Sequence, residues 1–444
     1  MSKYNFSVQT DMTKFNDFSE KNGGSIYQTS YWSEVKSAWK PSFYMGYDEN
    51  GQPVLSCLCL ERDIKVGKLW YCPDGFVCDL MNEALVVEFC AFMKSEMKKH
   101  KICAMVCDPL IIEELDGEKC DTSAVNSMLK GGFTLNEDKN FYIVQPAVAI
   151  CSPMKGYTPE TFLKKCEKGV RHGLKAAADG LLYTESYDHI TLEQHPEKLD
   201  EFFTVMTETA DRTEFIQRDK NYYKTMVTAL NGKAVMNFIY CDQKMRKDHC
   251  DELRNKKDEL ENKLVELEGA EKPNKKEISA IKKELDAINN TLARNAKVDK
   301  ELYEKYGDNV PEKLCLAVSI TSRFGKTAIC LYGGTRNVLR NTLRPTHYLN
   351  WVRIEDSFKQ GMEIHDLGRV TGDPHDENNP LFGLAKYKMS YNGQLTEYVG
   401  DMYLVNDKFT FMLFRKLLPK VKKVKNTILK KHIKEKTVSN SKSN

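Results

Sequence analysis

The sequence predicts a mixed α/β fold of two domains similar in style, with an antiparallel helical hairpin inserted into the second domain. Apolar runs of strand length alternate with amphipathic helical stretches both before and after residue 150. The chain has 444 residues, which is too long for one ordinary hydrophobic core. Residues 244–297 carry a separate helical repeat. Together these observations favour an α/β (α+β) body with an inserted arm.

Apolar patterning places the expected elements along the chain. Strands are expected at Pro53–Leu60, Ile102–Cys107, Phe141–Val148, Val235–Tyr240, Cys315–Ile320 and Ala328–Tyr332. Helices are expected at Glu83–Lys98, Leu199–Arg212 and Thr346–Gln360. The expected domains are residues 1–151, then 152–242 together with 299–414, with an arm at 243–298 and a tail at 415–444.

The arm is expected to be a helical hairpin that projects from the body. Leu253, Leu260 and Leu264 are seven and four residues apart, and the apolar residues from Ile278 to Leu292 alternate spacings of three and four. Each half therefore forms an a/d seam, and the intervening GAEKPNK is long enough only for a reversal. Fourteen basic and twelve acidic residues cover 244–297. This composition is typical of a structural or dimerising arm, and a dedicated binding arm is the alternative.

Positive charge is concentrated at the end of the chain. Residues 415–444 contain eleven Lys or Arg and one acid, so this tail carries +10, whereas the whole chain carries +3 and the rest −7. Apolar residues from Leu417 to Leu429 recur among the lysines, which predicts a basic amphipathic helix. Such a helix suits an anionic membrane surface, where each basic residue contributes on the order of 1 kcal/mol. RNA binding and simple solubility are the alternatives.

Composition and patterning limit the class of protein. With 41% hydrophobic and 29% charged residues, the chain can bury a core, which excludes wholesale disorder. Its apolar runs are far shorter than the ~20 residues of a membrane span. MSKYNFSVQTDM contains no apolar signal segment, and fourteen cysteines without a CxxC pair indicate reduced thiols. We therefore expect a cytoplasmic protein, peripheral at the inner face of the cell membrane.

Several common enzyme signatures are missing from the sequence. These are GxxxxGK[ST], GxGxxG, GxSxG, HExxH and the [RQ]xxGx[GA] loop that holds coenzyme A. His365-Asp366 and the loop from Asp373 to Asp376 contain potential metal ligands, but Asp and His beside a Pro usually form turns and caps. Neither a metal nor a cofactor is therefore expected.

Five segments carry the functional signal. They are YQTSYWSEVKSAW at 27–39, Asp108-Pro109, TADRTEFIQRDKNYY at 209–223, CLYGGTRN at 330–337, and Leu384–Tyr391 followed by TEYVGD. In order and spacing, from about Tyr27 to Leu404, they resemble the Fem family of aminoacyltransferases. Members of that family add amino acids from aminoacyl-tRNA to peptidoglycan precursors and so build the interpeptide bridge.

The resemblance implies a fold, partners and a reaction. The family fold consists of two tandem N-acetyltransferase-like domains, and members that use lipid II carry a coiled-coil hairpin at the position of the arm. The implied partners are aminoacyl-tRNA and a lipid-linked muropeptide precursor. Amide formation from an activated ester needs a well-placed amine and stabilisation of the tetrahedral intermediate, but no cofactor. The alternatives are a non-catalytic membrane- or RNA-binding adaptor of the same fold, and transfer to a soluble UDP-linked muropeptide.

The resemblance also assigns residues to the acceptor site. Lys36 and Arg218 match family residues that bind the sugar–diphosphate part of the acceptor, and cations suit that contact. Tyr222 lies one helical turn after Arg218 and matches a further acceptor-site tyrosine. Taken singly, each residue is more typical of a surface charge or a half-buried tyrosine, and the resemblance favours the acceptor-site assignment for Lys36 and Arg218.

Two further residues match positions close to the chemistry. Lys388 matches the lysine of a family Phe-Lys pair, with Tyr387 in place of the phenylalanine, and its ammonium would stabilise the oxyanion or orient the ester. Asp108 matches an aspartate that would position or deprotonate the acceptor amine. A lysine that pairs with a carboxylate and a turn-forming aspartate before proline are the alternatives.

A basic helix face is a candidate for RNA contact. Lys164, Lys168, Arg171 and Lys175 follow 4-3-4 spacing, which would align them on one helix. The arm is a second candidate for this contact, and a solvated helix face is the alternative for both.

Overall fold

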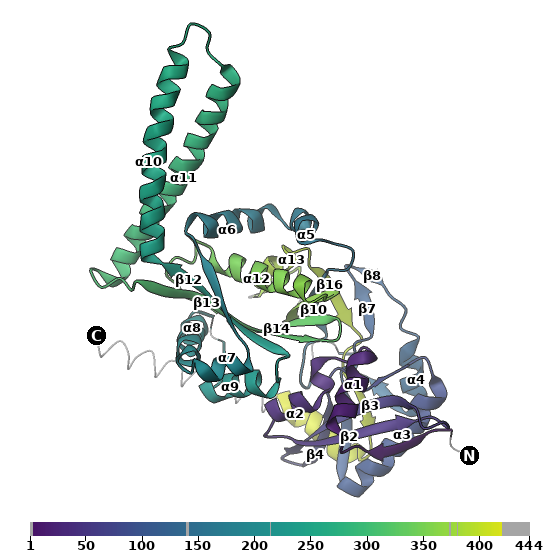
Figure 1. The fold of residues 1–444 in the computed structure, drawn as a ribbon. Helices are drawn as coiled ribbons and strands as arrows, with labels where there is room; N and C mark the ends of the chain where they lie inside the picture. Colours follow the sequence, from purple (N-terminus) through teal and green to yellow (C-terminus); the bar gives the residue numbers. More distant parts are fainter. Residues whose placement is uncertain (1–2, 139–141, 214, 373, 380, 420–444) are drawn as a thin grey trace.

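The computed structural model describes residues 3–138, 142–213, 215–372, 374–379 and 381–419. Within this part of the chain, two β-sheets with their covering helices form the body, and a long helical hairpin projects from one end of it (Figure 1). The predicted mixed α/β class is confirmed, as is the inserted hairpin.

The first sheet contains eight strands in the order β1-β2-β3-β4-β6-β17-β9, with β5 paired to β3. The strands are β1 (Asn5–Val8), β2 (Lys40–Tyr47), β3 (Pro53–Ile64), β4 (Gly67–Cys72), β5 (Val77–Cys78), β6 (Ile102–Cys107), β9 (Phe133–Leu135) and β17 (Met402–Val405). Every residue of β6 is buried, as expected for a central strand with apolar residues throughout. Helices α3 (Glu83–His100) and α4 (Ala124–Gly131) pack against each other and contribute to the core on one face of this sheet.

The second sheet contains nine strands in the order β11-β12-β13-β14-β15-β10-β16-β7-β8. The strands are β7 (Ile112–Leu115), β8 (Glu118–Lys119), β10 (Val148–Pro153), β11 (Tyr183–Tyr187), β12 (Ala234–Asp242), β13 (Lys313–Phe324), β14 (Thr327–Thr335), β15 (Ile364–Val370) and β16 (Gln394–Tyr398). Helix α8 (Glu197–Thr213) contacts β13 and β14, and α12 (Pro345–Lys359) packs against β12, β13 and β14. Shorter helices complete the body: α5 (Pro159–Lys165), α6 (Lys168–Asp179), α7 (His189–Gln194), α9 (Lys220–Ala229) and α13 (Phe382–Met389).

The two sheets exchange segments across the predicted domain ranges. Strand β17 comes from the end of the chain, yet it lies between β6 and β9 of the first sheet. Strands β7 and β8 come from the first 151 residues, yet β7 pairs with β16 of the second sheet. The chain therefore crosses between the sheets more than once, which ties the two halves together.

One hydrophobic core runs through both halves. It includes Phe15 and Trp32, which lie before residue 40, together with Phe202 and Tyr223 from the second half. Phe15 belongs to α1 (Met12–Lys21) and Trp32 to α2 (Ser30–Val35), and α2 packs directly on α9. Side chains that meet between the halves are therefore held by shared packing.

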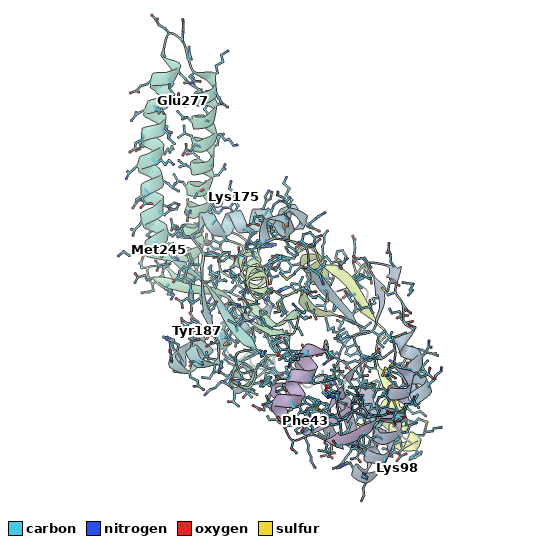
Figure 2. All side chains as sticks on the ribbon, turned by 45° about the vertical axis from the view of Figure 1, so that its right-hand side comes forward. Phe43, Lys98, Lys175, Tyr187, Met245 and Glu277 are labelled. Carbon is cyan, nitrogen blue, oxygen red and sulfur yellow. The ribbon has the colours of Figure 1, made fainter. Side chains whose placement is uncertain are left out.

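The arm consists of α10 (Gln243–Glu268) and α11 (Lys275–Tyr306), so the second helix continues past the expected end at residue 298. Ile281, Leu285 and Ile288 are buried along the predicted seam. Ion pairs join the two helices outside this seam: Lys256–Glu284 at 2.6 Å, and Lys263–Glu277 and Lys282–Glu268, both at 2.8 Å. Figure 2 shows Glu277 near the tip and Met245 near the base of the arm.

A buried arginine joins the two helices at the base of the arm. Arg246 is 1% exposed, and its guanidinium donates to Gln243 Oε1 and Asn295 Oδ1 and pairs with Asp299. We expect Arg246→Ala to lower the free energy of unfolding by on the order of 2 kcal/mol, because buried acceptors lose a charged donor. Urea unfolding followed by circular dichroism measures this change.

A control for this prediction lies on the same helix. The Arg254 side chain is 60% exposed and pairs with Asp251 at i,i+3. Because exposed ion pairs contribute little, Arg254→Ala should change the free energy of unfolding by less than about 0.5 kcal/mol. Equal losses for the two variants would show that Arg246 does not fasten the arm.

Five predicted strands and all three predicted helices are confirmed with small changes at their ends. The strand predicted at Phe141–Val148 is wrong, because residues 142–147 form no strand and β10 begins only at Val148. Pro146 lies directly before this start, and proline cannot donate a ladder hydrogen bond. Of the predicted tail helix, only residues 415–419 are described, and they belong to a helix that begins at residue 408. Residues 420–444 lie outside the described residues.

None of the helices within the described residues combines the length and the hydropathy of a membrane span.

Candidate functional site

Lys36, Arg218 and Tyr222 lie together where α2 meets α9. The Lys36 ammonium donates to the Tyr222 hydroxyl at 3.0 Å and lies 4.8 Å from the centre of the Trp32 ring. The Arg218 guanidinium lies 5.1 Å from the centre of the Tyr222 ring. Tyr332 of β14 completes this cluster, with its ring 6.4 Å from that of Tyr222. We call these five residues, with Trp32 included, the basic cluster.

Local structure explains why the basic cluster forms. Lys36 is the C-cap residue of α2, directly after its last turn, and Arg218 immediately precedes Asp219, the N-cap of α9. The Asp219 side chain accepts a hydrogen bond from the backbone N–H of Tyr222, which fixes the first turn of α9. Arg218 therefore lies before the helix and, contrary to the prediction from their spacing, does not share a helical face with Tyr222. It contacts the Tyr222 ring from the segment that leads into α9.

The two cations of the basic cluster have no carboxylate partner. Among the residues that the structure describes, neither Lys36 nor Arg218 forms an ion pair with Asp or Glu. Burial lowers the pKa of Lys36, and the neighbouring Arg218 lowers it further. Two adjacent cations that repel each other and lack a counter-charge are the arrangement that an anionic ligand stabilises.

Asp108 lies outside the basic cluster and accepts hydrogen bonds from three donors. The Tyr71 hydroxyl donates to its Oδ2 at 2.8 Å, Gln145 Nε2 to the same oxygen at 3.2 Å, and the backbone N–H of Asp74 to Oδ1 at 2.9 Å. Burial raises the pKa of Asp108 well above its usual value, as do the carboxylates of Asp74 and Asp401. These contacts give Asp108 the geometry of a residue that holds the turn containing Asp74.

Asp74 and Arg369 meet between the two sheets. One guanidinium nitrogen of Arg369 in β15 lies 3.6 Å from Asp74 Oδ1, beyond hydrogen-bond distance, and the guanidinium is 4.3 Å from the centre of the Tyr398 ring. Burial raises the pKa of Asp74 to about 6, and Arg369 opposes this shift. No sequence pattern singles out Asp74 or Arg369, because their segments carry no motif and they meet only through the tertiary fold.

Lys388 lies beside the point where two strands of the second sheet separate. Strands β14 and β15 pair in parallel only as far as Ile329 and Asp366, although β14 continues to Thr335 and β15 to Val370. The Lys388 ammonium donates to the carbonyl oxygens of Gly368 at 3.0 Å and Arg369 at 3.1 Å, beyond this point.

Glycine is required at residue 368 for this geometry. Its φ is +93°, which other residues rarely adopt, whereas a Cβ there would lie at an ordinary contact distance of 3.5 Å from Lys388 Nζ. Burial lowers the pKa of Lys388, whereas Asp366 raises it. The Lys388 ammonium is therefore largely removed from water, at the point where β14 and β15 stop pairing.

The Tyr387 side chain points away from the groups that Lys388 contacts. Its hydroxyl donates to the Thr346 carbonyl oxygen at 2.9 Å, accepts from Asn350 Nδ2 at 3.0 Å and lies 3.1 Å from the Tyr391 hydroxyl. These contacts lie in the core between α12 and α13. The structure therefore does not bring Tyr387 to the basic cluster.

A Cys–His–Ser chain lies next to Lys388 but lacks the properties of a nucleophilic relay. Cys330 Sγ is 3.2 Å from His365 Nε2, and His365 Nδ1 is 2.8 Å from Ser357 Oγ. Burial lowers the pKa of His365 to about 3 and raises that of Cys330. Both groups therefore stay neutral, and the thiolate that nucleophilic catalysis needs is disfavoured.

Tyr27 connects the basic cluster with Asp74. Its ring lies 4.5 Å from the Trp32 ring. Burial raises its pKa well above the usual value, and the Asp74 and Asp366 carboxylates and Tyr332 raise it further. Tyr27 thus contacts the basic cluster through Trp32 and is coupled electrostatically to Asp74 and to Asp366 and Arg369 of β15.

The four residues predicted for RNA contact lie on two helices, so the prediction of a single helix face is wrong. Lys164 belongs to α5, which ends at Lys165, whereas Lys168, Arg171 and Lys175 belong to α6. Arg171 donates to the carbonyl oxygens of Cys166 at 2.6 Å and Leu163 at 3.4 Å and so joins the helices. The three lysines are exposed, and Figure 2 shows Lys175 near the base of the arm.

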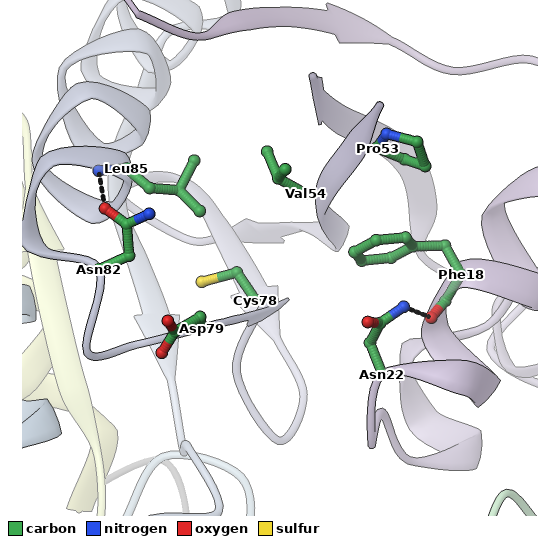
Figure 3. Close-up of a pocket in the computed structure, with 8 residues that line it drawn as sticks. All are labelled: Phe18, Asn22, Pro53, Val54, Cys78, Asp79, Asn82 and Leu85. Atoms are coloured by element: carbon green, nitrogen blue, oxygen red, sulfur yellow. Dashed lines mark hydrogen bonds between the residues drawn. The ribbon is translucent and has the colours of Figure 1, made fainter. Parts of the chain in front are cut away.

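A separate pocket of about 430 Å³ lies in the first sheet. Figure 3 shows its lining between the end of α1 and the start of α3, and the residues are Phe18, Asn22, Pro53, Val54, Cys78, Asp79, Asn82 and Leu85. None of the predicted site residues lines it. Asn82 and Asn22 are already bonded to backbone groups of Leu85 and Phe18, which leaves few free polar groups in the pocket.

Comparisons with known proteins agree with the fold and with the resemblance to the Fem family. A sequence model of the FemAB family matches residues 10–418. A protein of Staphylococcus aureus (strain USA300) named lipid II:glycine glycyltransferase is 22% identical over 413 residues, which cover 92% of this chain and 94% of the relative. A protein of the same name from Staphylococcus epidermidis (strain ATCC 35984) is 24% identical over 414 residues, with the same coverage.

Similarity to a solved structure supports the same fold. The crystal structure of FemX superposes with a TM-score of 0.75 at 20% identity and covers 93% of this chain and all of that chain. Since the family match spans nearly the whole chain, the protein belongs to the FemAB family and is an aminoacyltransferase.

Proposed function

We propose that the protein transfers an amino acid from aminoacyl-tRNA to the stem-peptide amine of a lipid-linked peptidoglycan precursor. The observation that carries this proposal is the basic cluster, where Lys36 and Arg218 lie side by side with no carboxylate partner among the described residues. A diphosphate supplies the missing negative charge and two sets of acceptor oxygens. The names of the relatives, which specify lipid II, agree with a diphosphate-bearing acceptor.

Lys388 is suited to stabilise the tetrahedral intermediate. An ammonium has three N–H donors, and two of those of Lys388 are taken by the Gly368 and Arg369 carbonyls. The third is available to the oxyanion that forms when the amine attacks the ester carbon. The acyl ester would enter between the diverging ends of β14 and β15, where backbone groups no longer pair with each other.

Exposed lysines near the arm are suited to contact RNA. Lys164, Lys168 and Lys175 are exposed, and α6 is joined to the arm where Arg294 donates to Asp179 at 2.9 Å. We propose phosphate contacts for these lysines without base specificity, since A-form RNA is recognised mainly by shape and backbone. Arg171 contributes through its link between α5 and α6 instead.

The helix at 408–419 is suited to the membrane surface at which a lipid-linked acceptor lies. Phe409 is 71% and Met412 48% exposed on this helix. Lys408 and Lys416 belong to the same helix, and the basic tail follows it in the sequence. Apolar anchors beside cationic residues are typical of interfacial helices on anionic lipid. We propose peripheral docking at the inner face of the cell membrane through this helix and the tail.

Mass spectrometry of the acceptor after incubation with a mixed pool of charged tRNAs tests the proposed function. We expect a mass increase of one or more amino-acid residues on a lipid-linked precursor in anionic vesicles. A UDP-linked precursor, supplied in a parallel reaction, should be a poorer acceptor. Binding of tRNA or lipid with no product from any donor would favour a non-catalytic adaptor. Preference for the UDP-linked precursor would show that the acceptor is a soluble muropeptide and not a lipid-linked one.

A further inference from the structure

We propose that Asp74 binds the ammonium group of the acceptor amine and accepts the proton that the amine must lose before it attacks. This inference rests on the proposed function, because it concerns the amine end of the molecule whose diphosphate the basic cluster would hold. In this proposal the proton acceptor is Asp74, and not Asp108 as the family resemblance implied.

The buried oxygen of Asp74 lacks a hydrogen-bond partner. The side chain is 4% exposed, and Oδ1 is buried without a hydrogen bond among the described residues. Arg369 is 3.6 Å from this oxygen, so the pair attracts electrostatically but forms no hydrogen bond. A buried acceptor without a donor costs roughly 1–3 kcal/mol, which a charged N–H donor would recover. A primary ammonium that reaches Oδ1 beside Arg369 supplies such a donor.

The backbone at Asp74 is held in an unusual conformation. Its φ is +57°, which non-glycine residues rarely adopt. Three contacts keep it there: the Asp74 N–H donates to Asp108, and Asp108 accepts from Tyr71 and Gln145. Strained conformations that the surroundings enforce are frequent at functional sites. Asp108 therefore acts as a positioning residue that directs Asp74 toward Arg369.

The charges around Asp74 favour a cation. The titratable groups that face it come from five parts of the chain and are Tyr27, Tyr71, Cys72, Asp108, Asp366, Arg369 and Tyr398. With Asp74 they comprise three carboxyl groups, of which Asp108 has a strongly raised pKa, and one guanidinium. The basic cluster, connected through Tyr27 and Trp32, has the opposite sign. One molecule with a diphosphate and an amine complements both ends.

The proton balance of the step is complete. Asp74 as carboxylate takes one proton from the ammonium, and the neutral amine then forms the N–C bond at the ester carbon. The ester C–O bond breaks, the ribose oxygen leaves and takes the second proton of the attacking nitrogen, and Asp74 later releases its proton to water. Because burial raises the pKa of Asp74 to about 6, the carboxylate accepts protons above that pH and is protonated below it.

Asp74→Asn tests this assignment with little disturbance of the fold, since asparagine matches the size of aspartate and tolerates positive φ. We expect kcat to fall about 100-fold, typical of loss of a general base. In the wild type, kcat/KM for the acceptor should rise tenfold per pH unit up to about pH 6 and then level off, and the variant should lose this limb. The KM for aminoacyl-tRNA should stay constant.

Asp116→Asn is the matched control, because Asp116 also has a positive φ, 50°, and lies in the turn between β7 and β8. It should keep wild-type kcat and the acidic limb. Wild-type turnover and an unchanged pH profile in Asp74→Asn would overturn the inference while leaving the proposed function intact. A shift confined to the KM of aminoacyl-tRNA would overturn it too, because the ammonium would then belong to the donor. Failure of the proposed function would instead appear as no product from the wild type.

Discussion

Arg218→Ala should raise the KM for the diphosphate-bearing acceptor and lower kcat/KM about 100-fold, with little change in the KM for aminoacyl-tRNA. The guanidinium lies 5.1 Å from the Tyr222 ring and beside Lys36, so its loss removes one of the two cations that would hold the diphosphate. A charged hydrogen bond contributes roughly 1.5–3 kcal/mol, which corresponds to about 10- to 160-fold, and the expected loss lies in the upper part of this range. Steady-state kinetics with each substrate varied in turn measure the effect.

Two further variants test whether the loss comes from the guanidinium of Arg218 or from the removal of any nearby positive charge. Arg218→Lys keeps the charge but loses the bidentate fork, and should recover part of the loss, to within about 10-fold of wild type. Lys220→Ala removes a cation two residues away that already pairs with Asp200 at 2.5 Å, and should leave the acceptor KM unchanged. Unchanged acceptor kinetics in Arg218→Ala would remove Arg218 from the acceptor site.

Lys388→Ala should lower kcat by about 100- to 1,000-fold with little change in either KM. The buried ammonium lies at the divergence of β14 and β15, where it would meet the oxyanion, and loss of one oxyanion donor costs this much in other acyl-transfer enzymes. Single-turnover kinetics with preformed aminoacyl-tRNA separate the chemical step from substrate binding.

A control for this variant lies on the same helix. Lys386 of α13 is exposed and lies over the Phe382 ring, away from the Gly368 carbonyl. Lys386→Ala should therefore keep wild-type turnover. A turnover in Lys388→Ala equal to that of the wild type would rule out the catalytic assignment of Lys388.

Local patterns predicted much of the fold. The buried run ICAMVC became β6, and the heptad spacing around Ile281 became the seam of the arm. These elements depend on the residues within them, so periodicity is sufficient. The place of β17 in the first sheet depends on pairing between segments nearly 300 residues apart, and no local pattern reports such a contact. The interruption between α5 and α6 was missed because the spacing of basic residues does not report the extended backbone at Cys166 and Glu167, where ψ is 150° and 156°.

Only part of the candidate site could be predicted from the sequence. Lys36, Arg218 and Tyr222 were found through the resemblance to the Fem family, and the structure brings these three together. Asp74 and Arg369 belong to segments without a motif, and only the contact between the two sheets brings them within 3.6 Å. Resemblance identifies residues that relatives share, whereas contacts particular to this chain require its coordinates.

A crystal structure with a water-soluble, diphosphate-bearing muropeptide tests the account most directly. We predict that diphosphate oxygens contact Lys36 Nζ and the Arg218 guanidinium, and that the free amine points past Tyr27 toward Asp74 and the end of β15. Diphosphate bound elsewhere, for example in the pocket beside Phe18 and Asn82, with the basic cluster empty, would contradict it.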